Sequence, residues 1–77
     1  MDKEFKQPDF NGRDIELSLS DNEVCVYATE AGLKKLIDFC QALIDKPQEG
    51  HIHLEDYEVL TQDSLNGVIA VFGSNEV

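Results

Sequence analysis

Apolar and polar residues alternate strictly along two neighbouring segments, and this period of two is typical of β-strands. The apolar members of the two segments are Ile15, Leu17, Leu19, Val24, Val26 and Ala28. If Asp21 and Asn22 form a two-residue turn, these residues pair across the two strands and all fall on one face. The pattern therefore predicts a hairpin with one apolar face, and it places Glu16 and Tyr27 on the opposite face.

After the hairpin, the apolar spacing changes to three and four residues, which predicts a helix from about Glu30 to Asp45. Thr29 offers an N-cap oxygen, and Pro47 stops the helix. The expected apolar stripe consists of Leu33, Leu36, Ile37, Cys40, Leu43 and Ile44, with Phe39 on its flank. We expect this stripe to face the core.

Residues 50–57 gather both histidines and two carboxylates on what the sequence predicts to be one short strand. Period-two geometry divides this strand into an outer face and a core face. The outer face carries His51, His53 and Glu55, and the core face carries Ile52 and Leu54. A final apolar run over residues 68–72 predicts a strand that is central in the sheet or meets another chain.

The predicted element order is β-β-α-β-β, and the predicted fold class is α+β. In its simplest form this is a two-layer sandwich, with one helix packed on a mostly antiparallel four-stranded sheet. Residues 1–13 are polar apart from Phe5 and Phe10 and show no sustained period, which predicts a flexible N-terminal arm. Residues 14–77 are expected to form a single α+β domain, because 77 residues leave room for one core.

The composition is strongly acidic, with 16 Asp and Glu against 6 Lys and Arg, for a formal net charge of -10. A field of this sign repels nucleic acid and anionic membranes and attracts basic protein surfaces. No apolar run approaches the length of a membrane span, and Cys25 and Cys40 lack the spacing of a redox or metal motif. We therefore expect a cytoplasmic protein with reduced thiols that binds neither nucleic acid nor membrane.

The histidine strand is the one place in the sequence where metal chemistry is plausible. His51 and His53 would lie roughly 7 Å apart at Cα on a strand, and Glu55 continues the same line. Zinc sites use three or four protein ligands, however, and the remaining sequence offers no third histidine and no paired cysteines. A nucleophile elbow and a glycine-rich phosphate loop are also missing. We expect no catalytic residue and no cofactor.

The outer face of the predicted sheet combines aromatic, imidazole and carboxylate groups, a mixture typical of recognition surfaces. The candidate partner-binding residues are Glu16, Tyr27, His51, His53, Glu55 and Ser64. One alternative is a small metal- or ligand-binding module that uses His51, His53 and Glu55. Another is a structural homodimer joined through the outer sheet face or an edge strand. The sequence alone leaves both a monomer and a homodimer open.

The segment GHIHLED at residues 50–56, with the later Leu60-Thr61 and Ser64, resembles the small bacterial immunity proteins of polymorphic toxin systems, specifically immunity protein family thirty-two. The similarity spans residues 14 to 72. It implies a cytoplasmic α+β protein that neutralises a cognate toxin by direct binding. It carries over the positions His51, His53, Leu54 and Ser64. A basic toxin domain would suit the charge of -10.

Overall fold

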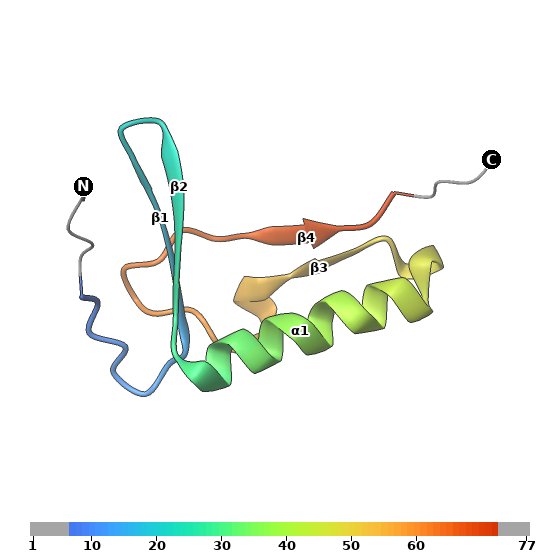
Figure 1. Cartoon of the computed structure of the whole chain (residues 1–77), viewed down its shortest axis with the longest axis horizontal. Helices are drawn as coiled ribbons and strands as arrows, with labels where there is room; N and C mark the ends of the chain where they lie inside the picture. The colour runs from blue at the N-terminus through green and yellow to red at the C-terminus, as the bar shows by residue number, and fades with distance from the viewer. Residues whose placement is uncertain (1–6, 73–77) are drawn as a thin grey trace.

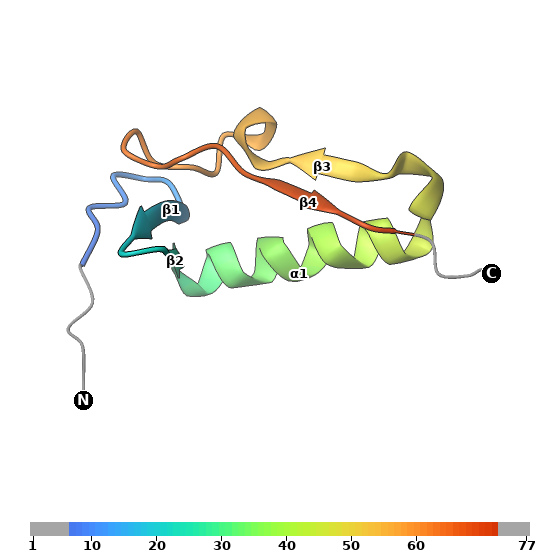
Figure 2. The same cartoon turned by 90° about the horizontal axis from the view of Figure 1, so that it is seen from above.

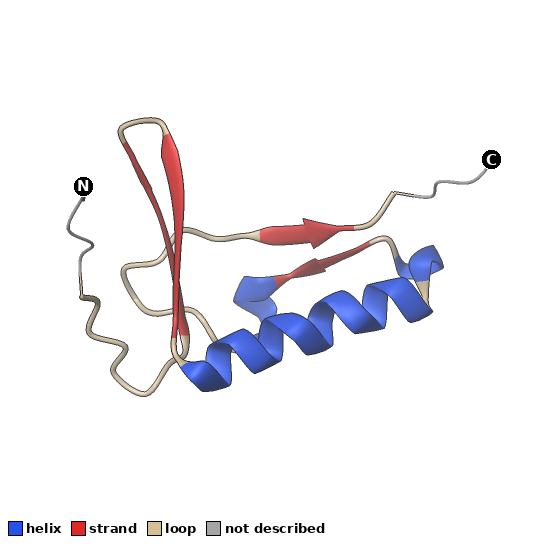
Figure 3. Ribbon diagram, in the orientation of Figure 1, coloured by secondary structure: helices blue, strands red, loops and turns tan. Residues whose placement is uncertain are grey.

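The computed structural model describes residues 7–72, and its helix and strands follow in the order β-β-α-β-β (Figure 1). The elements are β1 (Ile15–Ser20), β2 (Glu23–Ala28), α1 (Glu30–Asp45), β3 (His51–His53) and β4 (Val68–Ala70), with short 3-10 helices η1 (Pro47–Glu49) and η2 (Leu54–Tyr57). The fold class is α+β, as the sequence predicts (Figure 3). Between residues 7 and 72, no helix has the length and hydrophobicity needed to cross a membrane.

The hairpin of β1 and β2 has the register that the alternation predicts. Leu17 lies opposite Val26 and Leu19 opposite Val24 in an antiparallel pair. The turn residues Asp21 and Asn22 have φ values of 52° and 66°. Two consecutive left-handed residues match the right-handed twist of a hairpin, and Asp and Asn accept this conformation more readily than most residues.

The start of α1 is fixed by a small polar network around Asp14. Thr29 is the N-cap, and its Oγ1 accepts a hydrogen bond from the Gly32 N–H at 3.0 Å. The same hydroxyl donates to Oδ1 of Asp14 at 3.1 Å. Lys35 forms an ion pair with Oδ2 of Asp14, so that one carboxylate ties β1 to the first turns of the helix.

The predicted four-stranded sheet is wrong. The structure contains two separate two-stranded antiparallel sheets, one of β1 and β2 and the other of β3 and β4. The β3–β4 pair runs along α1, whereas the hairpin projects away from the start of the helix (Figures 1 and 2). The helix therefore lies against one pair of strands and leaves most of the hairpin uncovered.

The segment between η2 and β4 explains why the sheets do not join, because it occupies the edge of β1 that another strand would need. The N–H of Ile15 donates to the carbonyl of Val59 at 3.0 Å, and the N–H of Thr61 donates to the carbonyl of Ile15 at 2.9 Å. Further along, the N–H of Leu65 donates to the carbonyl of Leu17 at 2.9 Å. This pairing is irregular, with one isolated parallel bridge, but it satisfies the main-chain groups of β1.

The buried core is small and lies where α1, β1 and β3 meet. Its buried apolar side chains are Ile15, Leu43, Ile52, Leu54 and Val59. Ile52 and Leu54 thus face the core, as the sequence predicts. Phe39, placed by the sequence on the flank of the helix stripe, packs against the core, and its ring centroid lies 4.9 Å from that of Tyr57.

The orientation of α1 differs from the expectation that its whole apolar stripe is buried. Leu43 is buried and Leu36 is half-buried, but Leu33, Ile37 and Ile44 are each more than half exposed. The helix has turned so that Gly32, which has no side chain, lies against β1. The close approach of the two backbones at Gly32 directs one half of the wide apolar arc inward and leaves the other half in solvent.

The N-terminal arm predicted for residues 1–13 lies partly outside the described residues. Its described part reaches the segment that follows η2, because the Arg13 guanidinium donates a hydrogen bond to the carbonyl of Glu58. Phe10 is half-buried, in agreement with a role in holding this part of the chain.

Candidate functional site

His51 and His53 form an exposed pair on the face of β3 that points away from the core. Their side chains flank Ile52, which points inward. The two imidazole rings meet edge to face, with centroids 4.9 Å apart. Aromatic rings prefer this arrangement, because the positive edge of one ring meets the negative face of the other. The two histidines therefore present one preformed surface feature.

Glu55 lies beside this pair, although the strand that was predicted to carry it ends earlier. The prediction of one strand across residues 50–57 is wrong, since β3 stops at His53 and η2 begins at Leu54. The tight turn nevertheless returns the Glu55 carboxylate to within 3.1 Å of His53 Nδ1. The other Glu55 oxygen accepts a hydrogen bond from the Gly67 N–H at 3.3 Å. We call His51, His53 and Glu55 the histidine patch.

The environment of Glu55 favours its charged form. Its own backbone N–H has the largest influence and lowers the pKa of the carboxyl group, and the Gly67 N–H and His53 act in the same direction. Glu55 therefore carries a fixed negative charge beside two imidazoles. Within residues 7–72, no three His, Cys, Asp or Glu side chains are grouped in a way that could hold a metal ion.

The other predicted partner-binding residues lie elsewhere, and two of them serve the fold. Glu16 is 2% exposed, and its carboxylate accepts a hydrogen bond from the Thr61 hydroxyl at 2.7 Å. The Ser64 hydroxyl accepts a hydrogen bond from the Leu17 N–H at 2.8 Å and donates one to the Leu65 carbonyl. Both side chains thus attach the segment after η2 to β1. Tyr27 is half-buried on the hairpin.

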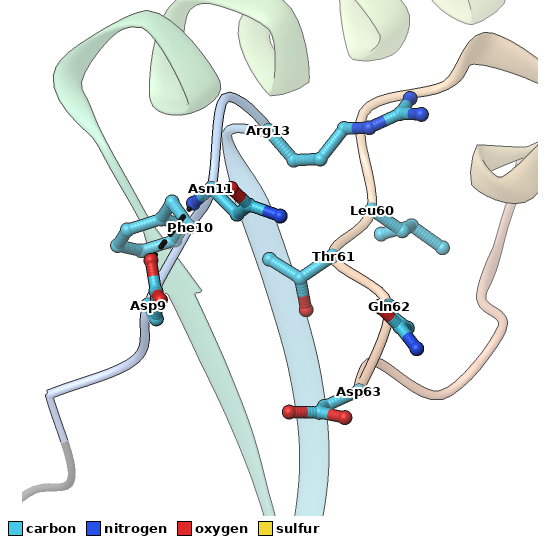
Figure 4. Close-up of a pocket in the computed structure, with 8 residues that line it drawn as sticks. All are labelled: Asp9, Phe10, Asn11, Arg13, Leu60, Thr61, Gln62 and Asp63. Atoms are coloured by element: carbon cyan, nitrogen blue, oxygen red, sulfur yellow. Dashed lines mark hydrogen bonds between the residues drawn. The ribbon is translucent and has the colours of Figure 1, made fainter.

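A pocket of about 300 Å³ lies between the N-terminal segment and the segment after η2 (Figure 4). It is lined by Asp9, Phe10, Asn11, Arg13, Leu60, Thr61, Gln62 and Asp63. The basic group of this lining, Arg13, is engaged by a main-chain carbonyl, and the Asn11 N–H donates to Asp9 at 3.1 Å. The pocket thus lies at the contact between two chain segments, and Arg13 bonds from the first of them to the main chain at the end of η2.

An apolar groove of 610 Å³ lies in the angle between the hairpin and the rest of the molecule. The apolar face of the hairpin forms one wall, and Leu36 and Cys40 of α1 contribute to the groove together with Leu54 and residues 65–69. The most exposed aliphatic side chains of the groove are Leu19, Val24, Val26, Leu65 and Val68.

A shallower apolar hollow on α1 shares Leu36 and Cys40 with the groove, so the two are continuous. It adds the outward half of the helix stripe, namely Leu33, Ile37 and Ile44. We call the groove and this stripe together the apolar surface. The sequence pattern indicated the aliphatic hairpin and helix residues of this surface, but it predicted that they face the core.

The chain was compared with protein families, curated proteins and solved structures. The model of the family described as Immunity protein 32 matches residues 23–73. This chain belongs to the immunity protein 32 family. The resemblance stated from residues 50–64 is thereby confirmed, and the matched region includes β2, α1, β3 and β4. The comparisons with curated proteins and with solved structures found no match to the chain.

Proposed function

We propose that this immunity protein neutralises a cognate bacterial toxin by binding it directly, without catalysing a reaction. The observation that carries the proposal is the match to the immunity protein 32 family over residues 23–73. The charge of -10 supports a basic toxin domain as the partner, because opposite net charges accelerate association and favour the correct pair. A toxin that acts on nucleic acid needs a basic surface, which an acidic protein can cover.

The histidine patch is the surface that we propose for the toxin contact. Its groups are solvent-accessible, and the Glu55 carboxylate is held in place by His53 and the Gly67 N–H. A carboxylate that is already oriented loses little conformational freedom when it pairs with a Lys or Arg of the partner. The imidazoles supply flat, amphipathic area beside this charge. Tyr27 is a further candidate contact on the hairpin.

Titration of toxin activity distinguishes binding from catalysis. The cognate toxin is assayed on its own substrate while the immunity protein is added in steps. A binding protein abolishes the activity at one chain per toxin, and the end point stays the same with longer incubation. Complete inactivation by far fewer chains than toxin molecules would show turnover and refute the proposal.

The contact surface is tested by a double substitution, His51→Ala with His53→Ala, and by Gln48→Ala as a control in the neighbouring η1. Removal of two central side chains of an interface is expected to weaken toxin binding by about 10- to 100-fold, measured by titration calorimetry. The control should leave the affinity unchanged, because Gln48 is exposed and outside the patch. Binding should also weaken as salt screens the charges. Equal affinities of the double variant and the control would contradict the assignment of the patch.

A further inference from the structure

The apolar surface is large for a protein of this size. Its exposed aliphatic side chains, defined above, are between 51% and 73% exposed. Added together, their exposed fractions correspond to roughly four to five fully exposed side chains. At roughly 60–120 Å² for each side chain, the exposed aliphatic area is on the order of 300–550 Å². An interface of standard size takes about 800 Å² from each partner, and about 65% of it is apolar in homodimers. The upper end of this range reaches the apolar area, about 520 Å², that one partner contributes to an interface of standard size with this apolar share.

The chemistry of this surface differs from that of the rest of the chain. Although the chain has a net charge of -10, no Asp, Glu, Lys or Arg lines the groove or the helix stripe within the described residues. A basic toxin held by charge would have nothing to pair with there. A neutral, aliphatic partner surface is the complementary occupant, and a second copy of this chain carries such a surface.

The two halves of the apolar surface are also complementary in shape. The hairpin offers a two-stranded apolar face, and α1 offers the stripe of Leu33, Ile37 and Ile44. A helix stripe packed on a sheet face is a standard way to bury both. Within one copy this cannot occur, because α1 already lies along β3 and β4 while the hairpin projects away from it (Figures 1 and 2).

We propose that two copies form a symmetric dimer, in which the exposed stripe of α1 from one copy packs on the apolar hairpin face of the other. A two-fold axis makes both contacts at once, since each copy supplies one helix stripe and one hairpin face. The proposed contact consists of the α1 stripe and the hairpin face, which do not include His51, His53 or Glu55, and the dimer forms without the toxin, so it does not rest on the proposed function. It also covers the exposed aliphatic side chains of the α1 stripe and of the hairpin face, which the small core leaves in water.

The first test is sedimentation equilibrium of the full chain between about 1 and 100 µM. We expect a species of twice the 8.6 kDa chain mass. Ile37→Asp places a charge in the contact and should weaken the dimer by more than about 100-fold. Ala42→Asp adds the same charge at an exposed position of α1 outside the stripe and should have no such effect. A wild-type chain that is monomeric throughout this range, or equal effects of the two variants, would overturn the proposal.

A second test needs no substitution and remains informative if Ile37→Asp fails to fold. Cys40 is exposed within the apolar surface, whereas Cys25 is half-buried on the other side of β2 from the groove. If the dimer forms, alkylation of Cys40 by iodoacetamide should slow by about 10-fold or more as the protein concentration rises through the dissociation constant of the dimer. The rate of Cys25 alkylation should stay constant. Constant rates for both thiols would overturn the proposal.

The salt dependence separates this dimer from a charge-driven complex. Two copies of charge -10 repel each other, so screening by salt from about 0.05 to 0.5 M should strengthen the dimer. Binding of a basic toxin should weaken over the same range. A self-association that weakens with added salt would show that opposite charges hold it, and would refute an apolar contact. Each result leaves the toxin titration unaffected, so the two proposals fail separately.

Discussion

Replacement of Gly32 by alanine has two opposite effects on stability. Alanine raises the helix propensity of α1, but its side chain clashes with the neighbouring segment at Asp14 and Ile15. Gly32 lies in the first turn of α1, where alanine is the better helix former. A Cβ at this position would lie 2.3 Å from the carbonyl oxygen of Asp14 and 3.1 Å from Cγ1 of Ile15. The first obstacle is main chain, and its oxygen accepts the Thr29 N–H at 3.0 Å. It therefore cannot rotate away as a side-chain tip could.

The two effects differ enough in size to predict the sign. Alanine gains about 1 kcal/mol over glycine in a helix interior. Relief of the clash requires α1 to move away from β1 by a large part of an ångström, and overpacking of this kind costs about 1–3 kcal/mol. Weakening of the Thr29–Asp14 main-chain bond adds about 1 kcal/mol. We expect Gly32→Ala to lose about 1–3 kcal/mol of unfolding free energy, which lowers the melting temperature by on the order of 10 °C in a domain of this length.

Urea unfolding followed by circular dichroism measures this loss, with all variants at the same protein concentration. Ala42→Gly is the matched control, because Ala42 is exposed on the same helix and reports propensity alone. It should lose about 1 kcal/mol. We therefore expect both substitutions, Gly32→Ala and Ala42→Gly, to destabilise the protein. A Gly32→Ala variant more stable than the wild type would refute the packing argument.

Substitutions at three further positions test the core and its polar supports. Leu43→Ala should lose about 2–5 kcal/mol of unfolding free energy in urea, because Leu43 is 2% exposed and leaves a cavity. Thr61→Val removes the hydroxyl that donates to buried Glu16 and should cost about 1–3 kcal/mol, whereas Thr61→Ser should retain most of the stability; equal losses would contradict this role. The hydrogen bond from Lys35, more than that from Thr29, lowers the pKa of Asp14 below its value in the unfolded chain. The charged Asp14 carboxylate therefore stabilises the fold fully at neutral pH, and this contribution is lost as the pH falls through the lowered pKa. Asp14→Asn should therefore reduce stability at pH 7 and flatten its decline below about pH 4, measured by urea unfolding at a series of pH values; an unchanged pH profile would argue against the network.

The sequence predicted those parts of the fold in which the deciding groups lie within one turn or one hairpin. The alternation around Asp21-Asn22 determines the register, because a shift of one residue would exchange the two faces of the hairpin. Thr29 and the apolar spacing after it determine where α1 begins, since capping and helical periodicity are local. The placement of Ile52 inward and of both histidines outward follows from the strand period.

Part of the candidate site could also be predicted from the sequence. His51 and His53 are neighbours because the strand period places them so, and the family resemblance rested on the same segment. Glu55 reaches His53 by a tight turn that the alternation did not indicate. Glu16 is buried against Thr61, which is distant in the sequence. The alternation placed Glu16 on the outer face of the hairpin and therefore did not indicate that it is buried.

Tertiary structure alone decided how the elements pack. The segment after η2 takes the free edge of β1, and this keeps the two pairs of strands from forming one sheet. The close approach at Gly32 sets the rotation of α1, and so determines which half of its apolar arc is buried. Periodicity marks a residue as apolar, but whether that residue meets the core, a second copy or water depends on groups far away in the chain. For this reason the sequence determined the strands, the helix and their faces, and only the tertiary structure showed that the predicted core is in large part an exposed apolar surface.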